Sequence, residues 1–154
     1  RVLALDAAQP FDMEEIQKKR VQLQQQRSKL LTIGIVGFGG FGQFLAKRMV
    51  KAGHRVLATS RGDYSDIARQ IGAEFYSDVD DFCEEHPEVV ILSMSILSTD
   101  TVLSRLPMMR LKRSTLIVDV LSVKVFPKQL LLERLEPHFD ILCTHPMFGP
   151  TSGA

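Results

Sequence analysis

The chain has 154 residues, of which 45% are apolar and 24% charged. This length and balance predict about one globular domain with a real core and exclude disorder as the main state. The formal net charge of +1 gives no reason to expect nucleic acid or an anionic membrane as a partner. Two cysteines are too few for a disulfide framework, no apolar run approaches the roughly 20 residues of a membrane span, and we expect no metal site.

Both ends of the sequence predict a piece cut from a longer protein. Residue 1 is Arg rather than Met, and no apolar signal region lies near it. Residues 149–154 (Gly-Pro-Thr-Ser-Gly-Ala) have turn chemistry rather than the pattern of a packed element.

The first 30 residues are predicted to form an extension that contains a helix. From Asp12 to about Leu30 the composition changes to Glu, Gln, Lys and Arg, which are good helix formers. Ile16 and Leu23 belong to a thin apolar stripe on this helix. Two interpretations stay open, a helix packed on the domain edge or a partner, and a solvated linker helix.

From residue 31 onward, short apolar runs alternate with segments of helical periodicity. In chain order we predict strand 32–36, helix 40–52, strand 54–60, a helix ending at 71, strand 74–76, helix 77–85, strand 89–95, a helix ending near 106, strand 115–120, helix 124–135 and strand 139–144. Gly53 and Gly72 are the expected helix stops. Asp63 or Ser65 is expected to cap the helix ending at 71, and Ser98 or Thr99 the helix ending near 106.

This alternation predicts an α/β fold, a doubly wound parallel (Rossmann) sheet with an N-terminal helical extension. The strands are almost continuously apolar, as expected when helices cover both faces of a parallel sheet. The predicted domains are therefore residues 1–30, the extension, and residues 31–154, a nucleotide-binding domain. In such a fold, ligands bind outside the carboxyl ends of the strands.

A glycine motif follows the first predicted strand and opens the first predicted helix of this domain. It reads Gly37-Phe38-Gly39-Gly40-Phe41-Gly42 and fits the pattern G-x-G-x-x-G. The first glycine allows a tight turn, the second lets the backbone approach a pyrophosphate, and the third lets the helix pack close to the sheet. The alternative is a glycine-rich turn without a ligand. We predict that these six residues bind a dinucleotide.

The end of the second strand indicates which dinucleotide is bound. Proteins that bind NAD place a carboxylate there for the ribose 2′-hydroxyl, whereas this sequence has Ser60-Arg61. A hydroxyl and a guanidinium suit a 2′-phosphate, so we predict NADP. In the alternative, Arg61 is a solvated cation and Asp63 binds the ribose.

Three segments follow the later strands and are expected at the same edge of the sheet. In residues 93–99, the hydroxyls of Ser95 and Thr99 are candidates for cofactor contacts, with helix capping as the alternative. The second and third segments are residues 119–124 and 144–150. In the third, His145 is the best-placed general base, since a free imidazole has a pKa near 6.5. Cys83 and Cys143 have no evident partner base and are interpreted as packing residues.

Taken together, these segments resemble the plant-type arogenate dehydrogenases of the arogenate/prephenate dehydrogenase family. The resemblance covers residues 31–154 well, and residues 5–12 look like the mature start of the same plant group. It rests on the segments 35–47 (IVGFGGFGQFLAK), 60–65 (SRGDYS), 82–87 (FCEEHP), 95–99 (SILST), 118–124 (VDVLSVK) and 140–150 (DILCTHPMFGP).

The resemblance implies oxidative decarboxylation of arogenate to tyrosine with NADP or NAD. It assigns to His145 the catalytic role of bonding the substrate 4-hydroxyl and removing its proton, and to Ser122 the holding of that hydroxyl or of the histidine. It further implies a homodimer in the chloroplast stroma, completed by a C-terminal helical domain that is absent from these 154 residues. This part alone is therefore expected to bind cofactor without necessarily turning over substrate.

One departure from the family pattern concerns the substrate. Arogenate-specific members usually carry an acid directly after Phe-Gly-Pro, where it can pair with the substrate amino group, whereas this sequence has Thr151 followed by Ser152. These two residues are the candidate substrate contacts. The alternatives are a prephenate dehydrogenase giving 4-hydroxyphenylpyruvate, a related β-hydroxyacid enzyme, and an NADP-binding module without catalysis.

Overall fold

The computed structural model describes residues 13, 16–22 and 30–151. The chain divides into two units, residues 1–30 and 31–154, and each is described by itself. In the first unit, residues 16–22 are helical and exposed. This agrees with the predicted helix where it is described, and the rest of that helix lies outside the described residues. The assignment of residues 31–154 as an NADP-binding domain stays a prediction.

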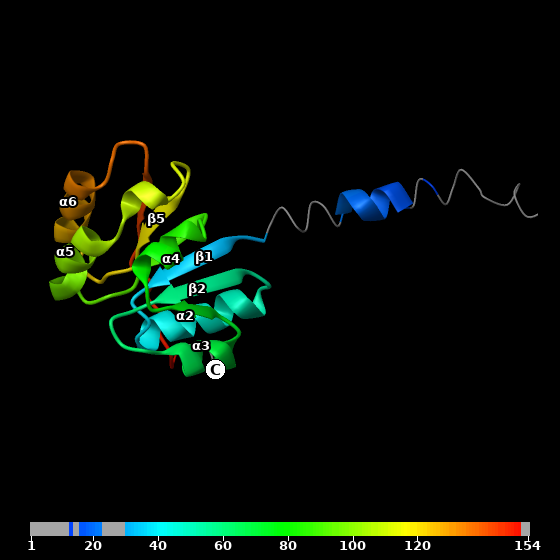
Figure 1. The fold of residues 1–154 in the computed structure, drawn as a ribbon, viewed down its shortest axis with the longest axis horizontal. Coiled ribbons are helices and arrows are strands. Elements are labelled where there is room, and N and C mark those ends of the chain that lie inside the picture. The colour runs from blue at the N-terminus through cyan, green and yellow to red at the C-terminus, as the bar shows by residue number, and fades with distance from the viewer. Residues whose placement is uncertain (1–12, 14–15, 23–29, 152–154) are drawn as a thin grey trace, which may run out of the picture. The chain divides into compact units, whose positions relative to one another are not determined.

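In the second unit, strands and helices alternate along the chain (Figure 1). The elements are β1 (Thr32–Val36), α2 (Gly40–Lys51), β2 (Arg55–Thr59), α3 (Ser65–Ile71), β3 (Glu74–Tyr76), α4 (Val79–Glu84), β4 (Val89–Leu92), α5 (Ile96–Arg105), the 3₁₀ turn η1 (Met108–Arg110), β5 (Leu116–Asp119), α6 (Val125–Arg134) and β6 (Asp140–Cys143). No helix among the described residues is long and apolar enough to cross a membrane.

The six strands form one sheet in the order β3-β2-β1-β4-β5-β6, and every neighbouring pair is parallel. This order defines the Rossmann type of doubly wound sheet, which confirms the predicted fold class. The order reverses direction between β1 and β4, so a crevice for a ligand is expected beyond their carboxyl ends.

Each face of the sheet carries its own hydrophobic core, because successive side chains of a strand point to opposite faces. Val36, Leu57 and Leu92 belong to one core, which includes side chains from α4, α5 and α6. Ile35 and Ala58 belong to the other, with side chains from α2 and α3. Figure 1 shows these two groups of helices on opposite sides of the strands.

The helix ends are the part of the sequence prediction that needs correction. The helix α5 begins at Ile96 with Ser95 at the N-cap, so the predicted cap at Ser98 or Thr99 is wrong. The predicted strand 89–95 ends at Leu92 because the following residues leave the sheet. Tyr64 occupies the N-cap of α3, and the Asp63 carboxylate accepts a hydrogen bond from the Ser65 backbone N–H at 2.9 Å instead.

Another predicted helix boundary is confirmed. The helix α3 ends at Gly72, which adopts the left-handed conformation with φ 89°. Pro127 lies in the first turn of α6, where its missing N–H costs no helical hydrogen bond.

Candidate functional site

The predicted site residues lie at one edge of the sheet. Gly37 follows β1, Ser60 follows β2, Ser95 follows β4, and Thr144 follows β6. Since all six strands are parallel, their carboxyl ends lie at this same edge. Chain order and parallel pairing therefore bring segments that are far apart in sequence to one edge of the sheet.

The turn after β1 is built so tightly that it requires glycine at two positions. Gly37 has φ +95°, and a Cβ there would lie 2.6 Å from the Ser93 carbonyl oxygen. Its N–H donates to the Thr59 carbonyl oxygen at 2.9 Å, which ties the turn to β2. A Cβ on Gly42 would lie 2.3 Å from the Gly37 carbonyl oxygen. These contacts hold the start of α2 against the end of β1, as the glycine motif predicts.

The outer side of the same turn is open. A Cβ on Gly39 or on Gly40 would meet no atom within 4 Å. The helix α2 has no side-chain cap and no acidic residue in its first turn. Its first N–H groups and the positive end of its dipole are therefore available to an anion. The residues present thus fit a dinucleotide pyrophosphate.

The two phenylalanines of the motif have different surroundings. The Phe38 side chain is fully buried and packs against Tyr64 and Phe75, with ring centroids 6.2 and 6.3 Å away. Only its backbone can face a ligand. Phe41 is half-buried and stacks on Phe44 at 6.0 Å.

A further polar contact supports the turn. The Gln43 side chain donates from Nε2 to the Phe38 carbonyl oxygen at 2.9 Å. No role is predicted for Gln43 from the sequence, although its position directly after the glycine motif indicates one.

Beyond β2, Arg61 and Asp63, the two candidates for contact with the ribose or its 2′-phosphate, have different surroundings. Arg61 is exposed, and within the described part of the chain its guanidinium forms no ion pair. Asp63 instead accepts hydrogen bonds from Ser65, chiefly from its backbone N–H, and these lower the pKa of the Asp63 carboxyl. The Asp63 carboxylate thus already accepts hydrogen bonds at the start of α3, whereas the Arg61 guanidinium has no ion-pair partner among the described residues.

After β4, the two candidate hydroxyls are arranged differently. Ser95 is exposed, and its Oγ lies 2.8 Å from the Oγ of Ser98. Thr99 is fully buried and donates from Oγ1 to the Ser95 carbonyl oxygen at 3.1 Å. The Thr99 hydroxyl is therefore engaged within α5, and Ser95 is the member of the pair that solvent can reach.

The two predicted catalytic residues are both exposed and follow adjacent strands. Ser122 lies in the loop between β5 and α6, and His145 lies directly beyond the end of β6. Between their two segments the structure places a polar network that the sequence analysis missed, formed by Asp119, Lys124 and Thr144. Lys124 Nζ donates to Asp119 Oδ2 at 2.6 Å and also to the Thr144 carbonyl oxygen. In the sequence, this network was indicated by a single acidic residue, Asp119, at the end of an apolar strand.

The segment that carries His145 is also held further along the chain. The ring of Phe148 lies 6.5 Å from that of Phe41 and 6.1 Å from that of Phe44. These contacts bring a segment that follows the edge strand β6 back to the first turns of α2. His145 thus lies between two residues that are held in place: Thr144, which is hydrogen-bonded to Asp119 and Lys124, and Phe148, which packs against Phe41 and Phe44.

Thr151 is exposed in the turn that ends the described chain, and Ser152 lies outside the described residues. Cys83 is buried, and burial raises the pKa of its thiol to about 12, in keeping with a packing role. Cys143 is half-buried and also unpaired.

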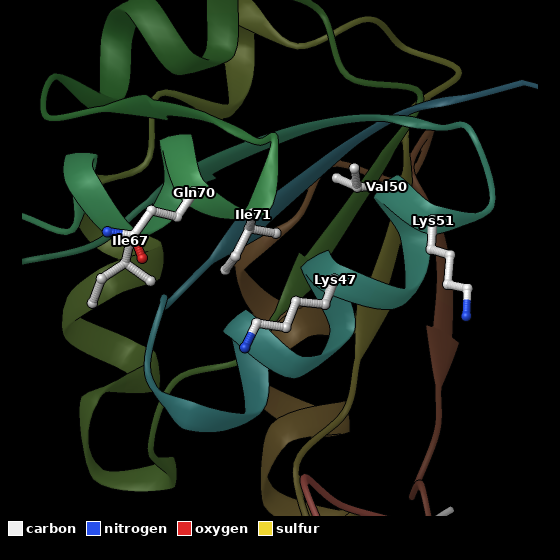
Figure 2. A pocket seen from close by; sticks show the side chains of 6 residues that line it. All are labelled: Lys47, Val50, Lys51, Ile67, Gln70 and Ile71. Carbon is white, nitrogen blue, oxygen red and sulfur yellow. The ribbon is translucent and has the colours of Figure 1, made fainter. Parts of the chain in front are cut away.

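A surface pocket of about 470 Å³ lies on the outer side of α2 and α3 (Figure 2). It is open to solvent and contains none of the predicted site residues. Its lining residues are Lys47, Val50, Lys51, Ile67, Gln70 and Ile71.

The strand order, the glycine turn after β1 and the open N-terminus of α2 define a nucleotide-binding oxidoreductase domain for an NAD(P) cofactor. Residues 32–123 match the family described as NADP oxidoreductase, coenzyme F420-dependent. This match covers more than half of the chain, which therefore belongs to that family.

Curated relatives and solved structures agree with this assignment. The chain is 54% identical over 153 residues to Arogenate dehydrogenase 2, chloroplastic, of Arabidopsis thaliana, covering 99% of this chain and 42% of the relative. It is 68% identical over 123 residues to Arogenate dehydrogenase 1, chloroplastic, of the same plant, covering 80% and 19%. The Synechocystis arogenate dehydrogenase superposes with a TM-score of 0.68 at 22% identity, over 79% of this chain and 43% of that one.

These similarities confirm the resemblance to plant arogenate dehydrogenases. The chain spans less than half the length of the curated relatives it matches, with 42% and 19% covered.

Proposed function

We propose that this chain is the NADP-binding part of an arogenate dehydrogenase of tyrosine biosynthesis in the chloroplast. The observation that carries the proposal is the convergence at one sheet edge of three features: an open glycine turn, Arg61 without an ion-pair partner among the described residues, and the segments of Ser122 and His145. The identity of 54% and 68% to two chloroplastic arogenate dehydrogenases supports both the activity and the location.

For the cofactor, each part of the edge has a distinct task. The backbone of residues 37–42 and the N-terminus of α2 bind the pyrophosphate. Ser60 and Arg61 bind the 2′-phosphate, which supports NADP over NAD because a guanidinium matches a phosphate dianion. The description of the matched family also names NADP. Ser95, beyond β4, is the exposed hydroxyl that would contact the cofactor, whereas buried Thr99 supports the first turn of α5.

For the reaction, the substrate class is a cyclohexadienol that carries a ring carboxylate. NADP⁺ bound at this edge would supply the hydride acceptor for the ring carbon that bears the 4-hydroxyl. His145 accepts the hydroxyl proton as the hydride departs, and Ser122 holds the hydroxyl or the imidazole in place. Loss of carbon dioxide leaves its electron pair in the ring, which becomes aromatic, and the phenolic oxygen regains a proton. Atoms and charge balance as arogenate and NADP⁺ giving tyrosine, carbon dioxide and NADPH.

Prephenate is the alternative substrate, because Thr151 is neutral and supplies no charge for the amino group of arogenate. The keto side chain of prephenate needs no such partner. We favour arogenate on the identity to the two plant enzymes.

The test is a steady-state assay of the protein at its natural length, with NADPH or NADH formation followed by absorbance. Arogenate and prephenate are each supplied with NADP⁺ and with NAD⁺, and a β-hydroxyacid serves as the control substrate. We expect the largest kcat/KM for arogenate with NADP⁺. A larger value for prephenate would reassign the substrate, and NADP⁺ binding without turnover of any substrate would favour a non-catalytic module.

A further inference from the structure

The network between β5 and β6 begins with a buried charge. The Asp119 side chain is fully buried at the carboxyl end of β5. Its Oδ1 accepts from the Leu121 backbone N–H at 2.7 Å, and its Oδ2 accepts from Lys124 Nζ at 2.6 Å. Burial of a carboxylate is costly unless it is paired and hydrogen-bonded. Asp119 is both, and its two oxygens fix the loop on either side of Ser122.

The same network reaches the segment of His145. Thr144 donates to the Asp119 carbonyl oxygen from its backbone N–H and from Oγ1, each at 2.8 Å. The Lys124 ammonium donates in turn to the Thr144 carbonyl oxygen, which belongs to the peptide bond that leads into His145. Lys124 is thus bonded to both segments at once.

We propose that Lys124 is a positioning residue that sets Ser122 and His145 relative to each other without touching the reacting atoms. This inference rests on the proposed function. The Lys124 ammonium has Asp119 and Thr144 as partners, and its positive charge is compensated by Asp119 at 2.6 Å. The pair therefore brings little net charge to the site, and its contribution is geometric. A displacement of about 1 Å in a catalytic group can cost on the order of 100-fold in rate.

The first variant for the test is Lys124→Met in the full-length protein, with Lys128→Met as the matched control. Lys128 lies on the same helix and is exposed. We expect Lys124→Met to lower kcat per NADP⁺-binding site by about 10- to 100-fold, with the Kd for NADP⁺ changed by less than about 2-fold. The control should match the unmodified protein. An unchanged kcat would overturn the proposal, and so would a raised substrate KM with unchanged kcat, because that result assigns Lys124 to substrate binding.

The second variant separates positioning from stability. Lys124→Met leaves the buried Asp119 carboxylate without its cation, which by itself destabilises the fold. In the double variant Asp119→Asn/Lys124→Met no charge remains unpaired, so Tm should return toward the reference value. We expect kcat of the double variant to stay low. Recovery of kcat together with Tm would show that Lys124 serves stability alone and would overturn the proposal.

A readout independent of turnover keeps this inference distinct from the proposed function. Amide hydrogen exchange should be faster in Lys124→Met at Leu121 and Thr144, whose N–H groups bond to Asp119, and unchanged in β1. If the unmodified protein oxidises neither arogenate nor prephenate, the proposed function fails, and the exchange rates still decide whether Lys124 holds the two segments. Unchanged exchange at both amides would overturn the inference by itself.

Discussion

Replacement of Arg61 by Ala tests the cofactor assignment at a single side chain. Arg61 is exposed and, among the described residues, has no ion-pair partner, so its removal breaks no ion pair among them. The nearby Asp63 carboxylate is held by Ser65 at 2.9 Å. The variant should therefore change binding of the 2′-phosphate and leave the fold as it is.

The size of the effect follows from this exposure. A hydrogen bond to a charged group is worth about 1.5–3 kcal/mol, with the low end appropriate to a solvated site. A loss of about 1.5 kcal/mol corresponds to a Kd for NADP⁺ raised about 10-fold. NAD⁺ has a hydroxyl in place of the phosphate, so its Kd should change by less than about 2-fold.

Calorimetric titration of the chain with NADP⁺ and then NAD⁺ measures both constants. Arg69→Ala is the matched control, since Arg69 is an exposed arginine on α3 that pairs with Asp66 at 3.2 Å. It removes the same charge from a neighbouring helix. Equal weakening of NADP⁺ and NAD⁺ in Arg61→Ala would refute the 2′-phosphate contact, and tighter binding of NAD⁺ by the unmodified chain would refute the choice of NADP.

Three further predictions concern the reaction, the turn and the surface. His145→Asn should lower turnover by about 10²- to 10⁴-fold with NADP⁺ affinity retained, because only the base is lost; turnover near the reference value would remove His145 from its role. Gly42→Ala should lower the urea midpoint of unfolding and weaken NADP⁺ binding, because its Cβ would lie 2.3 Å from a carbonyl oxygen. Gly40→Ala, which meets no atom within 4 Å, should retain the midpoint, and equal midpoints for the two variants would contradict the packing argument. Hydrogen bonding to Arg55 lowers the pKa of the Glu74 carboxyl from its ordinary 4.5. The stabilisation of the fold by this ion pair is therefore present above pH 4.5 and is lost as the pH falls through the lower pKa of the folded state. Urea midpoints of unfolding measured across this range should fall less steeply in Arg55→Ala than in the unmodified protein.

Local sequence patterns were sufficient to predict the class of fold and the tight glycine turn after β1. Apolar runs such as 32–36 and 115–120 lie close to the observed strands β1 and β5, because burial on both faces demands continuous apolar residues. Gly37 and Gly42 of the motif stand where the backbone has no room for a Cβ, and Gly37 also needs φ near +95°. These are properties of single residues and their neighbours, so the sequence alone reveals them.

The sequence alone was less informative where a local motif offered three equivalent capping positions. Ser95, Ser98 and Thr99 are all capping residue types, and the pattern favoured the later two. The backbone leaves the sheet after Leu92, which makes Ser95 the N-cap and places Thr99 inside the first turn. Where β4 ends depends on its pairing with β1 and β5, which no local window contains.

Only the tertiary structure decided how the candidate site at the edge of the sheet is held together. Asp119 and Thr144 are 25 residues apart, and their hydrogen bonds exist because the parallel register places Asp119 of β5 beside Cys143 of β6. The contact of Phe148 with Phe41 likewise joins the end of the described chain to the glycine turn. Composition and periodicity specify which residues are buried, whereas contacts between distant segments are fixed by strand order and register, and these exist only once the sheet has assembled.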